Sequence, residues 1–409
     1  MRTLSAALVA SVAVTALLPA AACEASSGPG SDRSAATHDR TGETASAGAR
    51  PGGDRPGGDR RVPQLHVSRM ITGLDHPWDV QPIGQGRLLY TQRDRATLSV
   101  WQHGSSHQVR FPSSKVWVSG ETGLMSLAID PSFASSGRFY TCQGGTTKHG
   151  HEVHVLAWHL NDAATRATRL GEVIGGFPTS SGRHGGCRLL IARDGSMLVG
   201  TGDAAIGTNP EDLHSLGGKT LRLDPRTGKP WPTNPFVHAK NRHQRFIQTY
   251  GHRNVQGLAQ RRDGSLWSVE QGTYRDDEVN KLRNGGDYGY NPVPGYNEDV
   301  PMTDQSLPGK QVRARWRSGN PTLATSGGTF VRGKKWGALN GALAVGVLKD
   351  ERLLFLSFDR TGHLQRARAP RPLGQFGRLR SVTVAPDHDL LVTTDNGNGN
   401  DAILRVSPR

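Results

Sequence analysis

A unit of two consecutive β-prone runs recurs along the chain and limits the folds that it can adopt. In each unit an apolar run is followed by a turn of Pro, Gly or Asp and then by a second short run. The units are several tens of residues apart, convincing helical periods are few, and the chain has 52 glycines. This pattern predicts an all-β protein, a six-bladed β-propeller with one unit in each blade. The second runs are Leu88–Thr91, Arg138–Thr141, Met197–Gly200, Leu266–Val269, Leu343–Gly346 and Leu390–Thr393.

The start of the chain has a different composition. Residues 1–23 contain Arg2, an apolar run from Leu4 to Leu18 and small residues before Cys23, which together predict an export signal. The apolar run is too short for a confident transmembrane anchor. Residues 24–62 are mostly Gly, Ser, Ala, Pro, Asp and Arg and contain PGGDR twice, which predicts a disordered tether. We therefore expect the folded domain at residues 63–409.

The end of the predicted signal and the charge of the chain bear on location and partners. Ala20-Ala21-Ala22-Cys23 resembles a bacterial lipoprotein cleavage box, in which Cys23 is acylated. We expect an exported lipoprotein that faces outside the cell and is held at the membrane by this lipid; a soluble secreted protein is the alternative. The net charge of +15 raises nucleic acid as a partner. Basic residues are scattered among acidic ones and no nucleic-acid motif is present, so we expect no nucleic-acid partner.

The stretch from Phe246 to Asn291 carries the most unusual polar chemistry. Tyr250-Gly251-His252-Arg253-Asn254 precedes one predicted strand, and Gln271-Gly272 with three acidic residues follows the next strand. A guanidinium beside an amide suits planar carboxylates and carbonyls, and acidic side chains with bent backbone carbonyls suit calcium. For any single residue the alternative is a solvated loop with capping acids. Because loops at strand ends of a propeller converge on one axial face, we expect a ligand pocket there.

The motifs YGHRNxQGLA, EQG, DDExN and GGxYGY follow one another in this stretch. Their order resembles the soluble quinoprotein sugar dehydrogenases, the glucose/sorbosone dehydrogenase family, which use pyrroloquinoline quinone (PQQ). The resemblance extends with gaps from about Leu74 to Pro408. It implies a six-bladed propeller, in agreement with the count of units. It also implies an oxidoreductase that oxidises the anomeric hydroxyl of an aldose sugar, or a related alcohol, with PQQ and calcium and an unspecified electron acceptor.

The resemblance implies roles for individual residues. His184, in the segment Ser181–Arg188, matches the catalytic base of the family, although a lone histidine near a strand is more often structural. Asp203, in GTGD, matches the aspartate that orients this base. PQQ is a tricarboxylate, so basic side chains suit it. Glu121 stands where the family often has a glutamine that contacts the cofactor, and an ionised carboxylate can only accept hydrogen bonds. The implied PQQ contacts are Glu121, Arg253, Asn254, Lys349, Arg378 and Arg380.

Metal sites and a disulfide complete the expected site. The resemblance implies that the backbone carbonyls of Gly272 and Thr273 bind calcium, and a carbonyl ligand tolerates Thr273 in place of the family's proline. Glu278 and Tyr288 match residues that hold a further calcium in some members. The adjacent second and third units each contain one cysteine, and in an exported protein these are candidates for a disulfide, with free thiols as the alternative. The two cysteines are Cys142 and Cys187.

Two other functions are compatible with parts of the sequence. A quinone-free propeller that acts as an envelope binding or scaffold lipoprotein is motivated by Glu121, Val255 and Thr273, where the family has other residues. A calcium-dependent propeller lactonase would need an acidic metal site on the axis and would not need the R-x-R pair, Arg378 and Arg380. The chain retains four basic residues that suit PQQ, and this argues against both alternatives. They are Arg253, Lys349, Arg378 and Arg380. The run Lys148–His154 has metal-ligand residue types but lacks a second clustered ligand pair, so it is interpreted as a loop that enters a strand.

Overall fold

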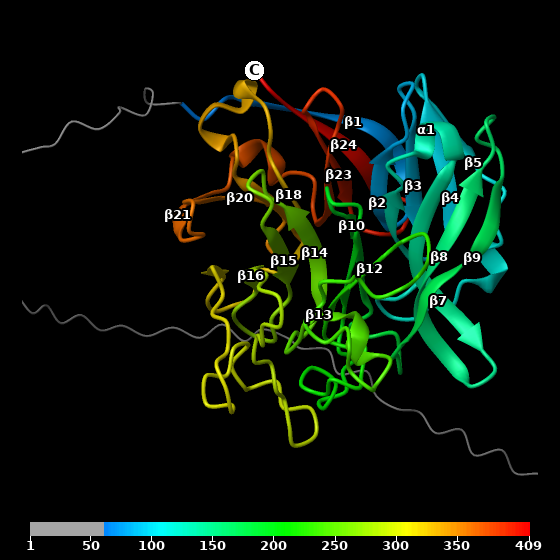
Figure 1. The fold of residues 1–409 in the computed structure, drawn as a ribbon. Helices are drawn as coiled ribbons and strands as arrows, with labels where there is room; N and C mark the ends of the chain where they lie inside the picture. Colours follow the sequence, from blue (N-terminus) through cyan, green and yellow to red (C-terminus); the bar gives the residue numbers. More distant parts are fainter. Residues whose placement is uncertain (1–60) are drawn as a thin grey trace, which may run out of the picture. The chain divides into compact units, whose positions relative to one another are not determined.

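Six four-stranded antiparallel sheets contain all 24 strands of the computed structural model, which describes residues 61–409. The innermost strands of neighbouring sheets contact one another in a closed ring, so the sheets are the blades of a propeller (Figure 1). This confirms the predicted six-bladed β-propeller. Cys23 and the rest of residues 1–60, which include the predicted signal and most of the tether, lie outside the described residues.

The bounds of the strands follow, blade by blade, from the inner to the outer strand. They are β2 (Pro77–Pro82), β3 (Leu88–Gln92), β4 (Thr97–Gln102) and β5 (Ser105–Gln108); β6 (Leu124–Ile129), β7 (Arg138–Thr147), β8 (Gly150–Leu160) and β9 (Ala167–Phe177); β10 (Gly186–Ile191), β11 (Met197–Thr201), β12 (Thr220–Leu223) and β13 (Ile247–Thr249); β14 (Val255–Gln260), β15 (Leu266–Glu270), β16 (Glu278–Lys281) and β17 (Trp316–Arg317); β18 (Thr325–Phe330), β19 (Leu343–Val347), β20 (Leu353–Phe358) and β21 (Leu364–Arg368); β22 (Leu379–Val384), β23 (Leu390–Thr394), β24 (Asp401–Pro408) and β1 (Leu65–Leu74).

The six predicted second runs are the second strands of the six blades. Strands β3, β11, β15, β19 and β23 are buried at every residue. Each of these strands lies inside a blade and is covered on both faces, which is why it reads as a continuous run and not as an alternation. The outer strands β5 and β21 are almost entirely exposed, and they gave little signal in the sequence.

The first strand completes the last blade. β1 pairs antiparallel with β24, with Leu65 opposite Pro408 and Val67 opposite Val406. In Figure 1 the blue N-terminal strand therefore lies beside the red C-terminal strand. The two ends of the domain are thus hydrogen-bonded within one blade, of which β1 is the outer strand, and this pairing holds the ring closed.

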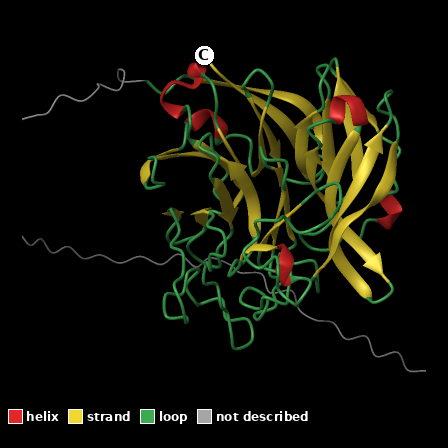
Figure 2. Ribbon diagram, in the orientation of Figure 1, coloured by secondary structure: helices red, strands yellow, loops and turns green. Residues whose placement is uncertain are grey.

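One end of the propeller collects the long connections. In every blade the inner strand begins opposite the end of the second strand, as Val255 pairs with Glu270 and Leu379 with Thr394. Each inner strand also has a register shift just inside this end, which re-aims its side chains. Figure 2 shows the irregular segments gathered at one end of the sheets. Most predicted site residues precede inner strands or follow second strands, so the fold brings them to the same end. Arg380 at the start of β22 and Glu278 at the start of β16, opposite Glu270, also lie at this end.

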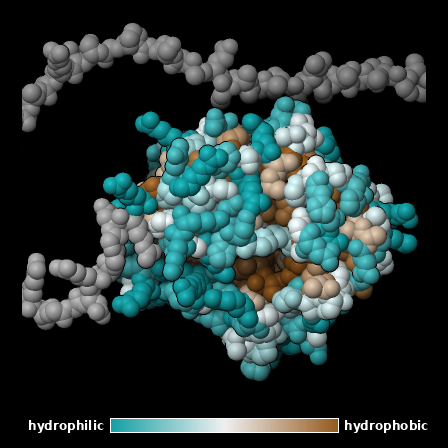
Figure 3. Space-filling view, turned by 90° about the horizontal axis from the view of Figure 1, so that it is seen from above, coloured by the Kyte–Doolittle hydropathy of each residue, from teal (hydrophilic) through white to brown (hydrophobic). Residues whose placement is uncertain are grey.

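Helices are a minor part of the described chain. They are α1 (Phe133–Ser136) and the 3₁₀ turns η1 (Ser113–Lys115), η2 (Gln244–Phe246), η3 (Lys334–Leu339) and η4 (Arg371–Leu373). Within residues 61–409, none is long and apolar enough to cross a membrane. Figure 3 shows hydrophilic residues over most of one face and hydrophobic residues in its hollows, as expected when the apolar side chains pack between blades.

Candidate active site

His184, just before β10, and Asp203, just after β11, form a buried pair in blade 3 at the end of the propeller that carries the long connections. His184 Nδ1 lies 2.8 Å from Asp203 Oδ1, and the two side chains are 4% and 0% exposed. The amide of Ala205 also donates to Asp203 Oδ1 at 2.8 Å. A Cβ at Gly202 would collide with the carbonyl of His184, so the glycine of the GTGD motif permits the close approach. The structure thus brings together the two residues that the resemblance paired as base and orienting carboxylate.

Tyr296 braces this pair from a loop that sequence analysis did not single out. Its hydroxyl donates to Asp203 Oδ2 at 2.7 Å and lies 3.0 Å from His184 Nδ1. Burial and then the charge of Asp203 raise the pKa of Tyr296, so its phenol stays a donor. Asp203 and Tyr296 both approach Nδ1, and no described residue contacts Nε2 of His184. The arrangement favours a ring with Nδ1 protonated and Nε2 free to accept a proton.

A carboxylate joins two arginines beside the pair. Arg253, just before β14, donates from Nη2 to Glu298 Oε1 at 2.6 Å and from Nη1 to the carbonyl of Gln271 at 3.3 Å. Arg183 donates to the same Glu298 oxygen at 2.7 Å. Burial raises the pKa of Glu298, but the hydrogen bonds from Arg183 and Arg253 outweigh this and hold it below the ordinary value. The Nε of Arg253 is buried and has no protein partner in the described chain.

Asn254 connects this group to Glu121 and to the neighbouring blades. Its Nδ2 donates to Glu121 Oε2 at 3.2 Å, and its Oδ1 accepts from the amide of Gly186 at 3.2 Å and from Gln256 Nε2 at 3.0 Å. Asn254 is fully buried, whereas Glu121 is half-buried. Glu121 therefore faces an amide donor at the edge of the site.

Arg380 joins the same network from blade 6. It donates from Nη1 to Gln256 Oε1 at 3.3 Å, and its Nε and Nη2 each donate to the carboxylate of Asp395 at 2.9 Å. Arg378 donates from Nε to the carbonyl of Asp395 at 3.0 Å. Burial raises the pKa of Asp395, but the charge of Arg380 outweighs it, so the carboxyl pKa is lowered. Asp395, which sequence analysis missed, already balances much of the charge of Arg380.

The family of the chain follows from a comparison of sequences. The family model for Glucose / Sorbosone dehydrogenase matches residues 74–405, which contain all of the contacts described above. The chain belongs to the glucose/sorbosone dehydrogenase family. The expected family is therefore confirmed, and with it an oxidoreductase of the sugar dehydrogenase class. Membership does not favour the scaffold or lactonase alternatives.

Relatives of the glucose/sorbosone dehydrogenase family match most of the chain. Aldose sugar dehydrogenase YliI of Escherichia coli K12 is 29% identical over 348 residues, which cover 82% of this chain and 91% of YliI. The PQQ-bound aldose sugar dehydrogenase of Streptomyces coelicolor is similar with a TM-score of 0.72 and 26% identity, over 86% of this chain and all of that one. The apo-form of the soluble E. coli enzyme has a TM-score of 0.75 and 27% identity, over 85% of this chain and all of that one.

The carbonyls predicted to bind calcium lie in a tight turn after β15. The amide of Gly272 donates to Asp277 Oδ1 at 2.9 Å, and a Cβ at Gly272 would collide with the carbonyl of Arg275. Neither the carbonyl of Gly272 nor that of Thr273 accepts a hydrogen bond from the described residues. The two oxygens are therefore available to a cation, next to the carbonyl of Gln271 that Arg253 contacts.

Glu278 and Tyr288 lie in a buried layer behind this turn. The carboxylate of Glu278 accepts from Thr303 at 2.9 Å and from Asn280 at 3.2 Å. Burial and then the charge of Glu270 on the neighbouring strand raise the pKa of Glu278. The hydroxyl of Tyr288 donates to the carbonyl of Lys281 at 2.8 Å. The phenol oxygen of Tyr288 also accepts from the amide of Arg283 at 3.0 Å, so its hydrogen-bond partners are Lys281 and Arg283 and not Glu278.

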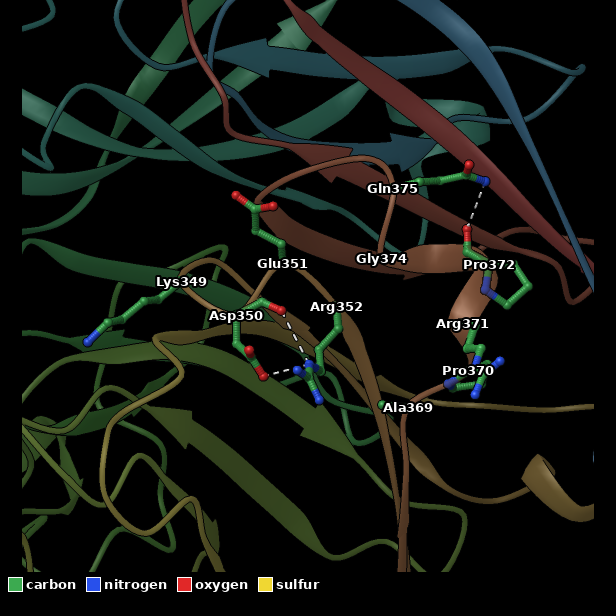
Figure 4. A pocket seen from close by; sticks show the side chains of 10 residues that line it. All are labelled: Lys349, Asp350, Glu351, Arg352, Ala369, Pro370, Arg371, Pro372, Gly374 and Gln375. Atoms are coloured by element: carbon green, nitrogen blue, oxygen red, sulfur yellow. Dashed lines mark hydrogen bonds and ion pairs between the residues drawn. The ribbon is translucent and has the colours of Figure 1, made fainter. Parts of the chain in front are cut away.

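Lys349 is not part of the hydrogen-bonded network around His184 in the described chain. Its side chain is exposed and lines a cavity of about 890 Å³ formed by the connection after β19 and the segment that leads to β22. Figure 4 shows Lys349 pointing away from Arg352, Arg371 and Gln375, which line the same cavity. Of the four basic residues expected at the cofactor, the network through Gln256 contains Arg253, Arg378 and Arg380 but not Lys349.

A disulfide lies next to the segment that carries His184. Cys142 on β7 and Cys187 on β10 are bonded, with 5.6 Å between their Cα atoms, and both are fully buried. The bond ties blade 2 to blade 3 next to the glycine bend that carries His184. The two cysteines named as candidates for a disulfide are therefore bonded to each other.

Proposed function

We propose that this member of the family is an exported quinoprotein that oxidises the anomeric hydroxyl of aldose sugars. The buried pair of His184 and Asp203, 2.8 Å apart, carries the proposal. Nε2 of His184 takes the hydroxyl proton, while Asp203 and Tyr296 hold the ring in position and Asp203 balances the positive charge that develops. When bound, PQQ with calcium supplies the acceptor for the hydride that leaves the anomeric carbon.

The residues around His184 fit an anionic planar group. Arg253 has a buried Nε without a protein partner, and fixed guanidinium forks suit carboxylates. Asn254 and Arg253 both donate to Gln271. Asn254 also accepts from Gln256, which accepts from Arg380, so these contacts join Arg253, Asn254 and Arg380. In this proposal Arg253, Asn254, Arg378 and Arg380 hold PQQ, Glu121 contacts its edge, and Lys349 reaches it from the neighbouring cavity. The PQQ-bound S. coelicolor relative supports this assignment.

Two calcium positions belong to the proposal. The free carbonyls of Gly272 and Thr273 provide hard oxygen ligands beside the Arg253 contact. Glu278, buried opposite Glu270, provides a second carboxylate site together with the backbone of Tyr288. A divalent cation there would offset the repulsion between Glu270 and Glu278.

An absorption experiment tests the proposed function. Purified protein is titrated with PQQ in the presence and absence of calcium, and a panel of aldoses and simple alcohols is then added. The proposal predicts calcium-dependent binding of PQQ, followed by loss of the oxidised quinone absorbance with at least one aldose. Binding of PQQ without reduction by any aldose or alcohol would reject the dehydrogenase function and favour a binding protein.

The location is a separate proposal. The sequence Ala20-Ala21-Ala22-Cys23 supports a mature chain that begins at an acylated Cys23 and is anchored in the membrane, with residues 24–62 as a tether. Intact-mass measurement of the protein from membranes should give a diacylglyceryl-modified N-terminus. An unmodified N-terminus on a soluble protein would support cleavage after the A-x-A site and secretion.

A further inference from the structure

Three metal-ligand side chains meet on blade 2 and share no residue with the His184 site. Glu152 and His154 lie on β8, and Glu172 lies on β9. His154 Nδ1 is 3.2 Å from Glu152 Oε1 and 3.4 Å from Glu172 Oε2. The run Lys148–His154 does enter a strand, as expected, but the ligand that it lacked in the sequence comes from the adjacent strand. This ligand is Glu172, brought into place by register shifts between β8 and β9.

The spacing of the three ligand atoms matches a small divalent ion. Nitrogen and carboxylate ligands lie about 2.0–2.2 Å from zinc, so two corners of a tetrahedral site are about 3.3–3.6 Å apart. The distances of 3.2 and 3.4 Å from His154 Nδ1 are close to this edge length. All three ligand atoms lie within 4.8 Å of one another. A metal ion would need only a small adjustment of the side chains.

Two glycines make room for the cluster. A Cβ at Gly145 would lie 2.8 Å from His154 Nε2, and a Cβ at Gly175 would lie 2.6 Å from Glu172 Oε1. Neither glycine has a positive φ, so space for these side chains, and not backbone conformation, accounts for the missing Cβ atoms. The amide of Gly176 donates to Glu152 Oε2 at 3.1 Å, which leaves Oε1 turned to the cluster. Such an outer hydrogen bond is typical of ligand carboxylates.

The charges of the cluster are not balanced by basic side chains. The chain has 50 Lys and Arg residues, yet in the described part neither Glu152 nor Glu172 forms an ion pair with any of them. The other cluster of this kind, Asp75 with His76 and Asp401, differs because Asp401 already accepts four hydrogen bonds. Glu172 is exposed, so the blade 2 cluster is also open to an ion from solvent.

We propose that Glu152, His154 and Glu172 form a binding site for a divalent transition metal, with zinc as the probe. One imidazole with two carboxylates suits zinc, whereas calcium prefers six to eight oxygen ligands. Three protein ligands leave one position of a tetrahedral ion for water. The site is independent of the dehydrogenase reaction and would remain if that function were rejected.

Calorimetric titration of the metal-free, PQQ-free full chain with zinc, in excess calcium, tests the site. We expect saturable zinc binding that His154→Gln and Glu172→Gln each weaken at least about tenfold, which is the smallest effect usual even for residues behind the ligands. His159→Gln is the matched control, because His159 is exposed on the same strand outside the cluster. It should bind zinc as the unchanged chain does.

Thermal unfolding without metal shows whether each variant folds. If His154→Gln does not fold, Glu172→Gln still tests the site, because Glu172 is exposed. No saturable zinc binding, or equal binding by the unchanged chain and the Glu172→Gln variant, would overturn the proposal. A contribution of the cluster to stability that depends on pH but does not change when zinc is added would also overturn the proposal. The cluster would then be a His154 imidazolium between two carboxylates and not a metal site.

Discussion

The substitution Asp203→Asn removes a charge next to the proposed base with little change in shape. The amide of Ala205 donates to Oδ1, so the asparagine oxygen should take this place and still accept from His184 Nδ1. The asparagine amide then replaces Oδ2 beside the hydroxyl of Tyr296, which can accept a hydrogen bond. The orientation of the imidazole should survive, and only the negative charge should be lost.

The expected loss follows from the buried geometry. Opposite unit charges about 4 Å apart interact by about 4 kcal/mol at an effective dielectric constant of 20. Part of this is offset by solvent and relaxation, and a hydrogen bond to a charged group exceeds a neutral one by about 1 kcal/mol. We therefore expect transition-state stabilisation to fall by about 2–4 kcal/mol, which corresponds to about a 30- to 1000-fold decrease in kcat.

Stopped-flow reduction of the PQQ-loaded enzyme by its best sugar measures this step in a single turnover. Asp203→Asn should lower the rate without weakening PQQ binding, because Asp203 forms no hydrogen bond with the guanidinium of Arg253 or Arg380. Tyr296→Phe is the matched control: it removes a donor to Asp203 but keeps the carboxylate charge, so its loss should be smaller. An Asp203→Asn enzyme as fast as the unchanged protein would refute this account of the pair.

Three further predictions concern stability. Asp395→Asn leaves the buried guanidinium of Arg380 without its carboxylate, so the free energy of unfolding should fall by about 3–5 kcal/mol. If Arg380 contacts PQQ, adding PQQ should raise the melting temperature of this variant more than that of the unchanged protein. An equal rise in both proteins would contradict the PQQ contact. Burial and then the charge of Asp287 raise the pKa of Glu211 to about 8, so the folded chain holds this proton more tightly than the unfolded one. Stability should therefore fall as the pH rises from about 4.3 towards 8, and urea unfolding of Glu211→Gln should lack this component of the slope. Removing the Cys142–Cys187 disulfide by Ala substitution should lower unfolding free energy by about 2–5 kcal/mol, and an unchanged urea midpoint would argue against its role.

The sequence predicted the parts of the fold that are buried on both faces. Strands β11, β15 and β23 are buried along their whole length, so their apolar runs stood out. The six second runs of this kind gave the number of blades. The pairing of β1 with β24 was not predicted, because β1 has few buried positions and its partner lies at the other end of the chain. His184 and Asp203 were found because the glycine-rich segments around them resemble motifs of the family; without that resemblance His184 would have been interpreted as a structural histidine.

Other site residues could not be found because irregular backbone or distant pairing positions them. Tyr296 and Glu298 come from the part of the long connection between β16 and β17 that follows the GGxYGY motif, and this part has no period and no motif of its own. Asp395 follows a second strand in blade 6 and acts through its contacts with Arg378 and Arg380. Glu172 reaches His154 through shifts in strand register, which a sequence does not reveal. Lys349 matched a motif, and the structure places it at a cavity and, among the described residues, gives it no hydrogen bond to the network around His184, so its contact with PQQ stays a prediction.

Single-turnover reduction by the variant His184→Ala tests the central claim most directly. The variant should fold and bind PQQ with calcium, because Arg253, Asn254 and Arg380 are held by other partners. Sugar-dependent reduction should fall by about a hundred- to ten-thousand-fold, the usual contribution of a general base. A PQQ-loaded His184→Ala protein that is reduced as fast as the unchanged protein by the same sugar would contradict the account.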